Sequence, residues 1–258
     1  MTATWLLLRG LSRSAGHWGS FPQQLAAALP DARVIALDLP GNGRLCGQRS
    51  ATSVAAMAEQ ARQQLLAAGV APPVHLVALS LGGMVACQWA VSWPQELCSV
   101  VLINTSLRGV SPVQQRMRPT AWPALLRLAL APCSDRQWEE TIHALTSQQP
   151  EQRQATVAAW LALRRQQLVA RLNVLRQLLA AARYRAPEQP PDVPLLLLAS
   201  QADRLVDSRC STTLARRWGV PLLLHPSAGH DLPLDDPGWL IEQLRQWQAG
   251  LAARRPRA

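Results

Sequence analysis

The sequence of 258 residues contains no lysine and is poor in aromatic residues, which make up 5% of it. All 26 basic residues are arginine, against 16 acidic residues, so the formal net charge is +10 at pH 7. Charged residues nevertheless amount to only 16% of the chain, and no stretch interleaves basic with aromatic residues as nucleic-acid-binding segments do. The positive charge alone therefore does not predict a nucleic-acid-binding protein.

The sequence also shows no pattern from which we expect a metal motif, a leader segment or a membrane span. The five cysteines have no C-x-x-C spacing, which predicts a reducing compartment and no metal site. We also expect no organic cofactor. The apolar run at 5–8 is far too short for a signal peptide or a membrane span, and no basic n-region precedes it. We expect a cytoplasmic protein with no membrane partner.

What the chain does contain is apolar residues, at 48%, in short runs that alternate with helical patterns. Continuous apolar runs of this length are typical of strands that are buried on both faces of a parallel sheet. The alternation predicts an α/β fold with a doubly wound, mostly parallel sheet of about six strands. The expected strands are residues 5–8, 33–37, 74–79, 99–103, 193–199 and 220–224.

The strand signal disappears between residues 106 and 191 and is replaced by helical patterns, for example at 155–163 and 168–184. We therefore expect a core made of residues 1–105 and 192–258, with residues 106–191 inserted as a helical cap or lid. Residues 106–188 contain twelve arginines and five carboxylates, a net charge of +7. Most of the excess positive charge of the chain thus lies in this insertion.

The stretch Ala78-Leu79-Ser80-Leu81-Gly82 joins an expected strand to an expected helix. A serine in such a sharp turn is held in a strained conformation that exposes its hydroxyl, and small residues two positions before and after it let strand and helix pack closely. The stretch resembles the nucleophile elbow of the α/β-hydrolase family, G-x-S-x-G, with Ala78 in place of the first glycine. The resemblance implies that Ser80 is a catalytic nucleophile.

A serine hydroxyl needs a base, and the base needs an acid that fixes its tautomer. Asp203 and His230 each follow an expected strand, and their order after Ser80 is the one typical of α/β-hydrolases. The carboxyl ends of parallel strands share one edge of the sheet, so we expect the three residues to converge there. Asp207 competes with Asp203 for the acid role, although the start of a helix suits Asp207 better as a cap.

The family resemblance extends over residues 5–106 and 195–251 and includes a D-x-P-G-x-G turn at 38–43. It implies a sheet without the first two strands of the family and an oxyanion hole made of the backbone N–H groups of Leu11 and Leu81. Arg9 stands where the family usually has histidine. We predict that Arg9 contacts an acidic group of the substrate, with a salt bridge within the protein or a solvated loop charge as the alternative.

The resemblance predicts a serine hydrolase that cleaves a carboxylic ester through an acyl-enzyme, with lactones or thioesters as alternative substrates. A cofactor-free lyase and a non-catalytic binding relative remain open, because one fold supports several chemistries. The basic insertion also resembles the carrier-protein methyl ester esterases of biotin synthesis, which predicts an acidic acyl carrier protein as partner and a pimeloyl-carrier methyl ester as substrate. The alternative is a solvated basic surface that faces a small-molecule ester.

Overall fold

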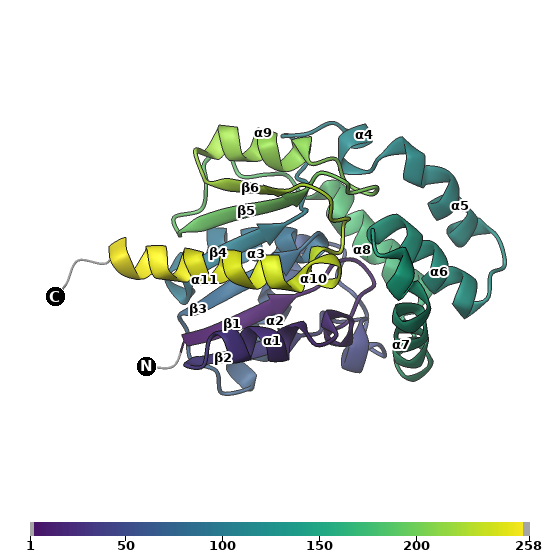
Figure 1. Cartoon of the computed structure of the whole chain (residues 1–258), viewed down its shortest axis with the longest axis horizontal. Helices are drawn as coiled ribbons and strands as arrows, with labels where there is room; N and C mark the ends of the chain where they lie inside the picture. The colour runs from purple at the N-terminus through teal and green to yellow at the C-terminus, as the bar shows by residue number, and fades with distance from the viewer. Residues whose placement is uncertain (1–2, 255–258) are drawn as a thin grey trace.

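The computed structural model of the chain, which describes residues 3–254, is organised around one sheet of six parallel strands (Figure 1). The strand order is β2-β1-β3-β4-β5-β6. The doubly wound fold predicted from the sequence is confirmed. The strands are β1 (Ala3–Leu8), β2 (Ala32–Leu37), β3 (Val74–Leu79), β4 (Leu97–Ile103), β5 (Leu195–Ser200) and β6 (Leu222–His225).

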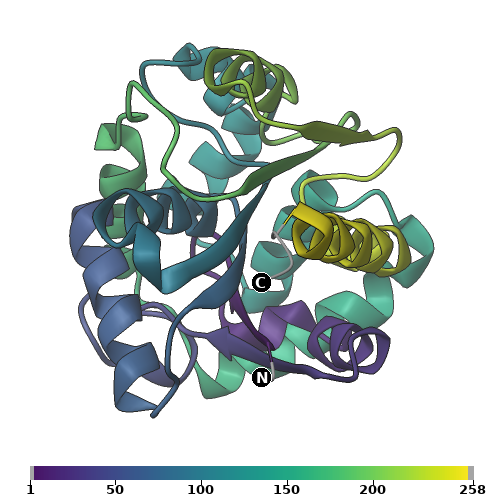
Figure 2. The ribbon, with the colours of Figure 1, turned by 90° about the vertical axis from the view of Figure 1, so that its left-hand side faces the viewer.

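Helices cover both faces of the sheet, as the end-on view in Figure 2 shows. Successive side chains of a strand point to opposite faces, so Leu6 and Leu8 of β1 join one hydrophobic cluster while Trp5 and Leu7 join the other. One face is covered by α2 (Val54–Ala67), α3 (Leu81–Ser92) and α9 (Arg209–Trp218), and the other by α1 (Phe21–Ala28) and α11 (Pro237–Arg254). Two buried layers therefore hold the carboxyl ends of the strands in place.

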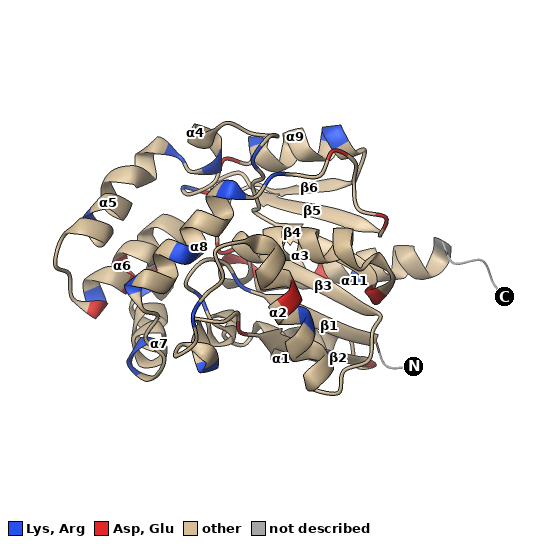
Figure 3. Cartoon of the chain, turned by 180° about the vertical axis from the view of Figure 1, so that it is seen from behind, with Lys and Arg blue, Asp and Glu red and all other residues tan. Residues whose placement is uncertain are grey.

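Residues 106–191, named here the helical insertion, leave the sheet after β4 and return to it at β5. Figure 1 places α5 to α8 beyond the carboxyl ends of the strands, and Figure 3 shows the arginines spread over them. That the insertion acts as a separate lid stays a prediction. Its helices are α4 (Val113–Arg116), α5 (Trp122–Leu130), α6 (Asp135–Thr146), α7 (Arg153–Gln166) and α8 (Arg171–Arg183).

The chain after the His230 loop ends in two consecutive helices. It is divided into α10 (Leu232–Asp235) and α11, because Asp236 has non-helical backbone angles of φ −148° and ψ 76° and Pro237 begins the second helix. Asp236 Oδ1 accepts the N–H of Trp239 at 2.9 Å, which fixes the new start. Within residues 3–254, no helix combines the length and the apolar character needed to cross a membrane.

Candidate active site

Ser80 lies in the turn between β3 and α3 with φ 58° and ψ −118°, a positive φ that side-chain-bearing residues rarely adopt. Its backbone is held on both sides, since its N–H donates to the carbonyl of Ile103 at 2.9 Å and its carbonyl accepts from Thr105 Oγ1. Ser80 is half-buried, whereas Leu79 and Leu81 on either side of it are buried. The turn therefore has the strained backbone of the predicted elbow, with the serine at its apex.

Glycines make the close approach around Ser80 possible. A Cβ atom on Gly82 would lie 2.6 Å from the carbonyl oxygens of Leu8 and Arg9, so α3 could not pack this close to β1 with a larger residue there. A Cβ atom on Gly10 would lie 3.0 Å from Ser80 Cβ. Ala78, in contrast, is fully buried within β3, and the elbow forms although Ala78 replaces the usual glycine.

His230 and Asp203 form a direct pair. His230 Nδ1 and Asp203 Oδ2 are 2.7 Å apart, and both residues are less than 5% exposed. Asp203 Oδ1 accepts the N–H groups of Leu205 at 2.7 Å and Val206 at 2.9 Å, so both oxygens of this carboxylate are hydrogen-bonded and its orientation is fixed. Because a carboxylate only accepts, the pair places a proton on Nδ1, and Nε2 is then the basic atom of the neutral imidazole.

Asp207, the competing candidate for the acid, contacts arginines instead of His230. Its carboxylate makes an ion pair with Arg209 at 2.7 Å and lies 3.6 Å from Arg118. Hydrogen bonds from the Arg209 side chain lower the pKa of Asp207 below its ordinary value. Its Oδ1 also accepts the N–H of Arg209, the first residue of α9. The geometry therefore pairs His230 with Asp203 and leaves Asp207 at a helix start.

Asn104 connects the elbow to the histidine loop, and its role was not predicted. It directly follows Ile103, which accepts the Ser80 N–H, and has a positive φ of 48°. Its Nδ2 donates to the carbonyl of His230 at 2.9 Å, while its Oδ1 accepts the N–H of Ser200 at 2.8 Å. An asparagine directly after a buried strand was the signal available in the sequence. Asn104 thus places the loops after β4 and β5 against the His230 backbone.

The described residues contain no hydrogen bond between Ser80 Oγ and His230. Such bonds are often long in a free enzyme and tighten when substrate binds. The two residues predicted to supply the oxyanion-hole N–H groups are chain neighbours of Ser80 and of Gly10, respectively. Leu81 begins α3, and Leu11 follows Gly10, which packs against Ser80. The roles of Leu11 and Leu81 stay predictions.

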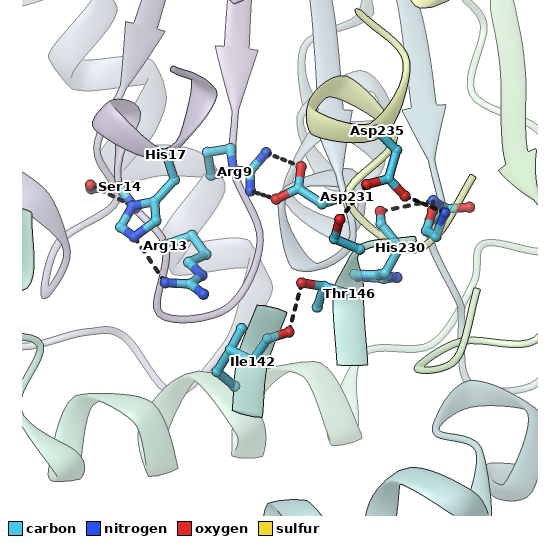
Figure 4. Close-up of polar contacts among 12 residues, drawn as sticks. Arg9, Arg13, Ser14, His17, Ile142, Thr146, His230, Asp231 and Asp235 are labelled. Carbon is cyan, nitrogen blue, oxygen red and sulfur yellow. Dashed lines mark hydrogen bonds and ion pairs between the residues drawn. The ribbon is translucent and has the colours of Figure 1, made fainter. Parts of the chain in front are cut away.

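Arg9 makes a buried ion pair with Asp231 (Figure 4). Its two terminal nitrogens lie 2.9 and 2.6 Å from the two carboxylate oxygens, and the side chains are only 2% and 4% exposed. The guanidinium carbon also lies 5.0 Å from the centre of the Trp18 ring. The predicted contact of Arg9 with an acidic substrate group needs a free guanidinium, so the geometry favours the alternative, a salt bridge within the protein.

The other histidines have packing or local roles within the described chain. His75 stacks on Trp5 with ring centres 4.5 Å apart, and His225 contacts Asp236 at 3.1 Å. His143 is 2% exposed inside the insertion. Burial, reinforced by the charges of nearby arginines, lowers the pKa of His17 well below its ordinary value.

Metal-binding clusters of three or more histidine, cysteine or carboxylate side chains are absent from residues 3–254. The five cysteines are free thiols, and burial raises the pKa of Cys87 to about 12. Cys87 therefore stays a protonated thiol near neutral pH and is a poor nucleophile.

Comparison with known proteins identifies the family of the chain. The model described as "Alpha/beta hydrolase family" matches residues 5–243. The chain belongs to this family. It is 41% identical over 101 residues to a Variovorax paradoxus protein named as a carbamate hydrolase, and 30% identical over 118 residues to a Chromobacterium violaceum protein named pimeloyl-[acyl-carrier protein] methyl ester esterase.

Those two matches cover 38% and 46% of this chain, and 36% and 40% of the length of the relatives. The chain therefore matches well under half the length of either relative. A thermophilic esterase from Thermogutta terrifontis matches the structure with a TM-score of 0.74 at 20% identity, over 96% of this chain and 90% of that one. The alpha/beta hydrolase membership predicted from the elbow is thus confirmed, and the structural match shows a shared fold.

Proposed function

We propose that this alpha/beta hydrolase cleaves carboxylic esters with Ser80 as nucleophile, His230 as base and Asp203 as the acid that orients His230. The observation that supports it most is the 2.7 Å pair between His230 Nδ1 and Asp203 Oδ2 on loops beside the strained Ser80 turn. Esterase names among the relatives support esters as the substrate class. Nucleophile, base and orienting acid are the three parts that acyl transfer by serine requires.

The proposed reaction has two halves. Ser80 Oγ attacks the ester carbonyl carbon while His230 Nε2 accepts the hydroxyl proton, and the N–H groups of Leu81 and Leu11 stabilise the oxyanion. Collapse of this intermediate breaks the ester C–O bond, and His230 returns the proton to the leaving alcohol. Water, deprotonated by His230, then attacks the carbonyl carbon of the acyl-enzyme. Collapse of this second intermediate breaks the bond between the acyl carbon and Ser80 Oγ, His230 returns the proton to Ser80 Oγ, and the carboxylic acid leaves. Asp203 stabilises the imidazolium in both halves.

Covalent labelling tests the proposal. A fluorophosphonate is expected to add one phosphonyl group to the enzyme, on the tryptic peptide that contains Ser80, and a p-nitrophenyl ester is expected to give a burst of nitrophenolate that matches the enzyme concentration. Mass spectrometry and stopped-flow absorbance measure the two. Absence of both the adduct and the burst, with turnover of a substrate for elimination, would favour a lyase on the same fold.

We further propose an acyl carrier ester as the substrate, with the carrier held by the basic insertion. The insertion has a net charge of +7, and Arg127 on α5 and Arg165 on α7 are exposed. Both features support an acidic partner. The double variant R127E/R165E is expected to raise KM for a carrier-bound methyl ester by about tenfold, an estimate for two lost charge contacts, and to leave KM for a small ester unchanged.

A matched variant, R33E/R216E, removes two exposed arginines outside the insertion and serves as the control. It is expected to leave both KM values near those of the wild type. Equal effects of the two double variants on the carrier ester, or equal effects of R127E/R165E on carrier and small esters, would contradict the carrier proposal while leaving the esterase proposal intact.

A further inference from the structure

A turn of the helical insertion, residues 146–149, contacts the loops that carry both His230 and Asp203. On the histidine side, the N–H of Asp231 donates to the carbonyl of Thr146 at 2.8 Å (Figure 4). On the aspartate side, Gln148 Nε2 donates to the carbonyl of Ala202 at 2.7 Å. One short turn outside the core thus reaches the residues next to His230 and Asp203.

Asp235 is the centre of these contacts. Its Oδ2 accepts the N–H of Gly229 at 2.6 Å and that of Gln148 at 2.9 Å, and its Oδ1 accepts from Ser147 Oγ at 2.6 Å. Its backbone carbonyl accepts from Gln149 Nε2 at 2.9 Å. Asp235 therefore bonds to the residue that precedes His230 and, at the same time, to three residues of the insertion.

Asp235 is only 7% exposed, and none of the ion pairs of the described chain includes its carboxylate. Burial raises its pKa above the ordinary aspartate value. Burying a carboxylate without a cation is unfavourable unless its oxygens are hydrogen-bonded. Here three neutral donors bond to the carboxylate oxygens. Two of them, on Ser147 and Gln148, belong to the insertion, and the third, on Gly229, belongs to the loop that carries His230.

The backbone on each side of His230 packs closely against the insertion. A Cβ atom on Gly229 would lie 2.6 Å from the carbonyl oxygen of Thr146. That same oxygen accepts the N–H of Asp231. His230 thus lies between two residues that contact the insertion turn. On the core side, Asn104 Nδ2 donates to the carbonyl of His230 at 2.9 Å.

We propose that Asp235 is a positioning residue for His230, and that residues 146–149 of the insertion are part of the catalytic machinery through it. This inference rests on the proposed esterase function. A general base works only when its reacting atom is correctly placed, and a displacement of about 1 Å is enough to lower the rate about 100-fold. Loss of the Asp235 contacts frees the Gly229 backbone and lets the imidazole move away from Ser80.

The test compares four variants for kcat and KM on a p-nitrophenyl ester, with folded fraction and melting temperature from circular dichroism. D235A is expected to lower kcat per folded enzyme by about 10- to 100-fold with KM within about twofold of the wild type. D235N is expected to recover most of kcat, because its amide oxygen can accept both N–H groups and its NH₂ group can donate to Ser147 Oγ. S147A, which removes one donor, is expected to lower kcat several-fold with little change in melting temperature.

Asp236 provides the matched control, since it is the next aspartate and its carboxylate also accepts a backbone N–H, but its partners, Trp239 and His225, are not the residues that flank His230. D236A is expected to keep the kcat of the wild type per folded enzyme. The proposal is overturned if D235A and D236A have the same kcat per folded enzyme. Should D235A not fold, a kcat of S147A per folded enzyme equal to that of the wild type overturns it. A wild type without ester turnover or labelling refutes the esterase function instead.

Discussion

Replacement of Ser80 with alanine is expected to lower kcat for carboxylic esters by about 10⁴- to 10⁶-fold, the range seen when a serine nucleophile is removed. The alanine variant has no oxygen to form the acyl-enzyme, so turnover falls to the level that oxyanion binding alone supports. Active-site labelling by a fluorophosphonate should vanish with it. Steady-state hydrolysis of p-nitrophenyl esters and intact-mass spectrometry measure the two losses.

The matched control is Ser92→Ala, at the other end of the same helix α3. Ser92 is exposed, and its Oγ accepts a hydrogen bond from Gln88 at 2.9 Å far from the elbow. This variant is expected to keep the kcat and the labelling of the wild type. Retention of more than about 1% of kcat by Ser80→Ala would mean that Ser80 is not the nucleophile, since a missing nucleophile lowers the rate far more than that.

Replacement of Arg9 with methionine is expected to lower the free energy of unfolding by about 3–5 kcal/mol, the effect of removing one partner from a buried ion pair. Methionine keeps part of the apolar contact with Trp18 but leaves the Asp231 carboxylate, 4% exposed, without its cation. Urea unfolding followed by tryptophan fluorescence measures the change. The effect follows from the unpaired charge, so it should not depend on substrate.

Two further variants separate the charge from the packing. The double variant R9M/D231N removes both charges and is expected to regain part of the lost stability, because no unpaired carboxylate remains. Arg245→Met breaks an ion pair with Glu242 whose side chains are 59% and 44% exposed, and should change the free energy of unfolding by less than about 1 kcal/mol. If R9M and R245M lower the free energy of unfolding by the same amount, the Arg9–Asp231 pair contributes no more to stability than a surface ion pair does.

The features that the sequence predicts well are those written in local patterns. The Ser80 turn needs only a strand, a serine, small neighbours and a helix, and all of these stand within a few residues of each other. Asp203 and His230 could be placed because parallel strands end at one edge of the sheet, so a position directly after a strand already specifies a location in space.

The features that could not be predicted depend on partners far apart in the chain. Arg9 and Asp231 are 222 residues apart, and nothing next to Arg9 indicates that its charge is neutralised inside the protein. Asp235 likewise resembles any acidic residue near a helix until Ser147 and Gln148 are placed beside it.

The contacts of residues 146–149 bear on protein engineering. An insertion that only covered the sheet edge could be exchanged between hydrolases like a cassette, with substrate preference as the main outcome. Here Thr146, Ser147 and Gln148 share hydrogen bonds with the loop that holds Asp231 and Asp235. A chimera that replaces residues 106–191 therefore has to transfer both sides of this contact together, because each side supplies the donors or acceptors that the other one lacks.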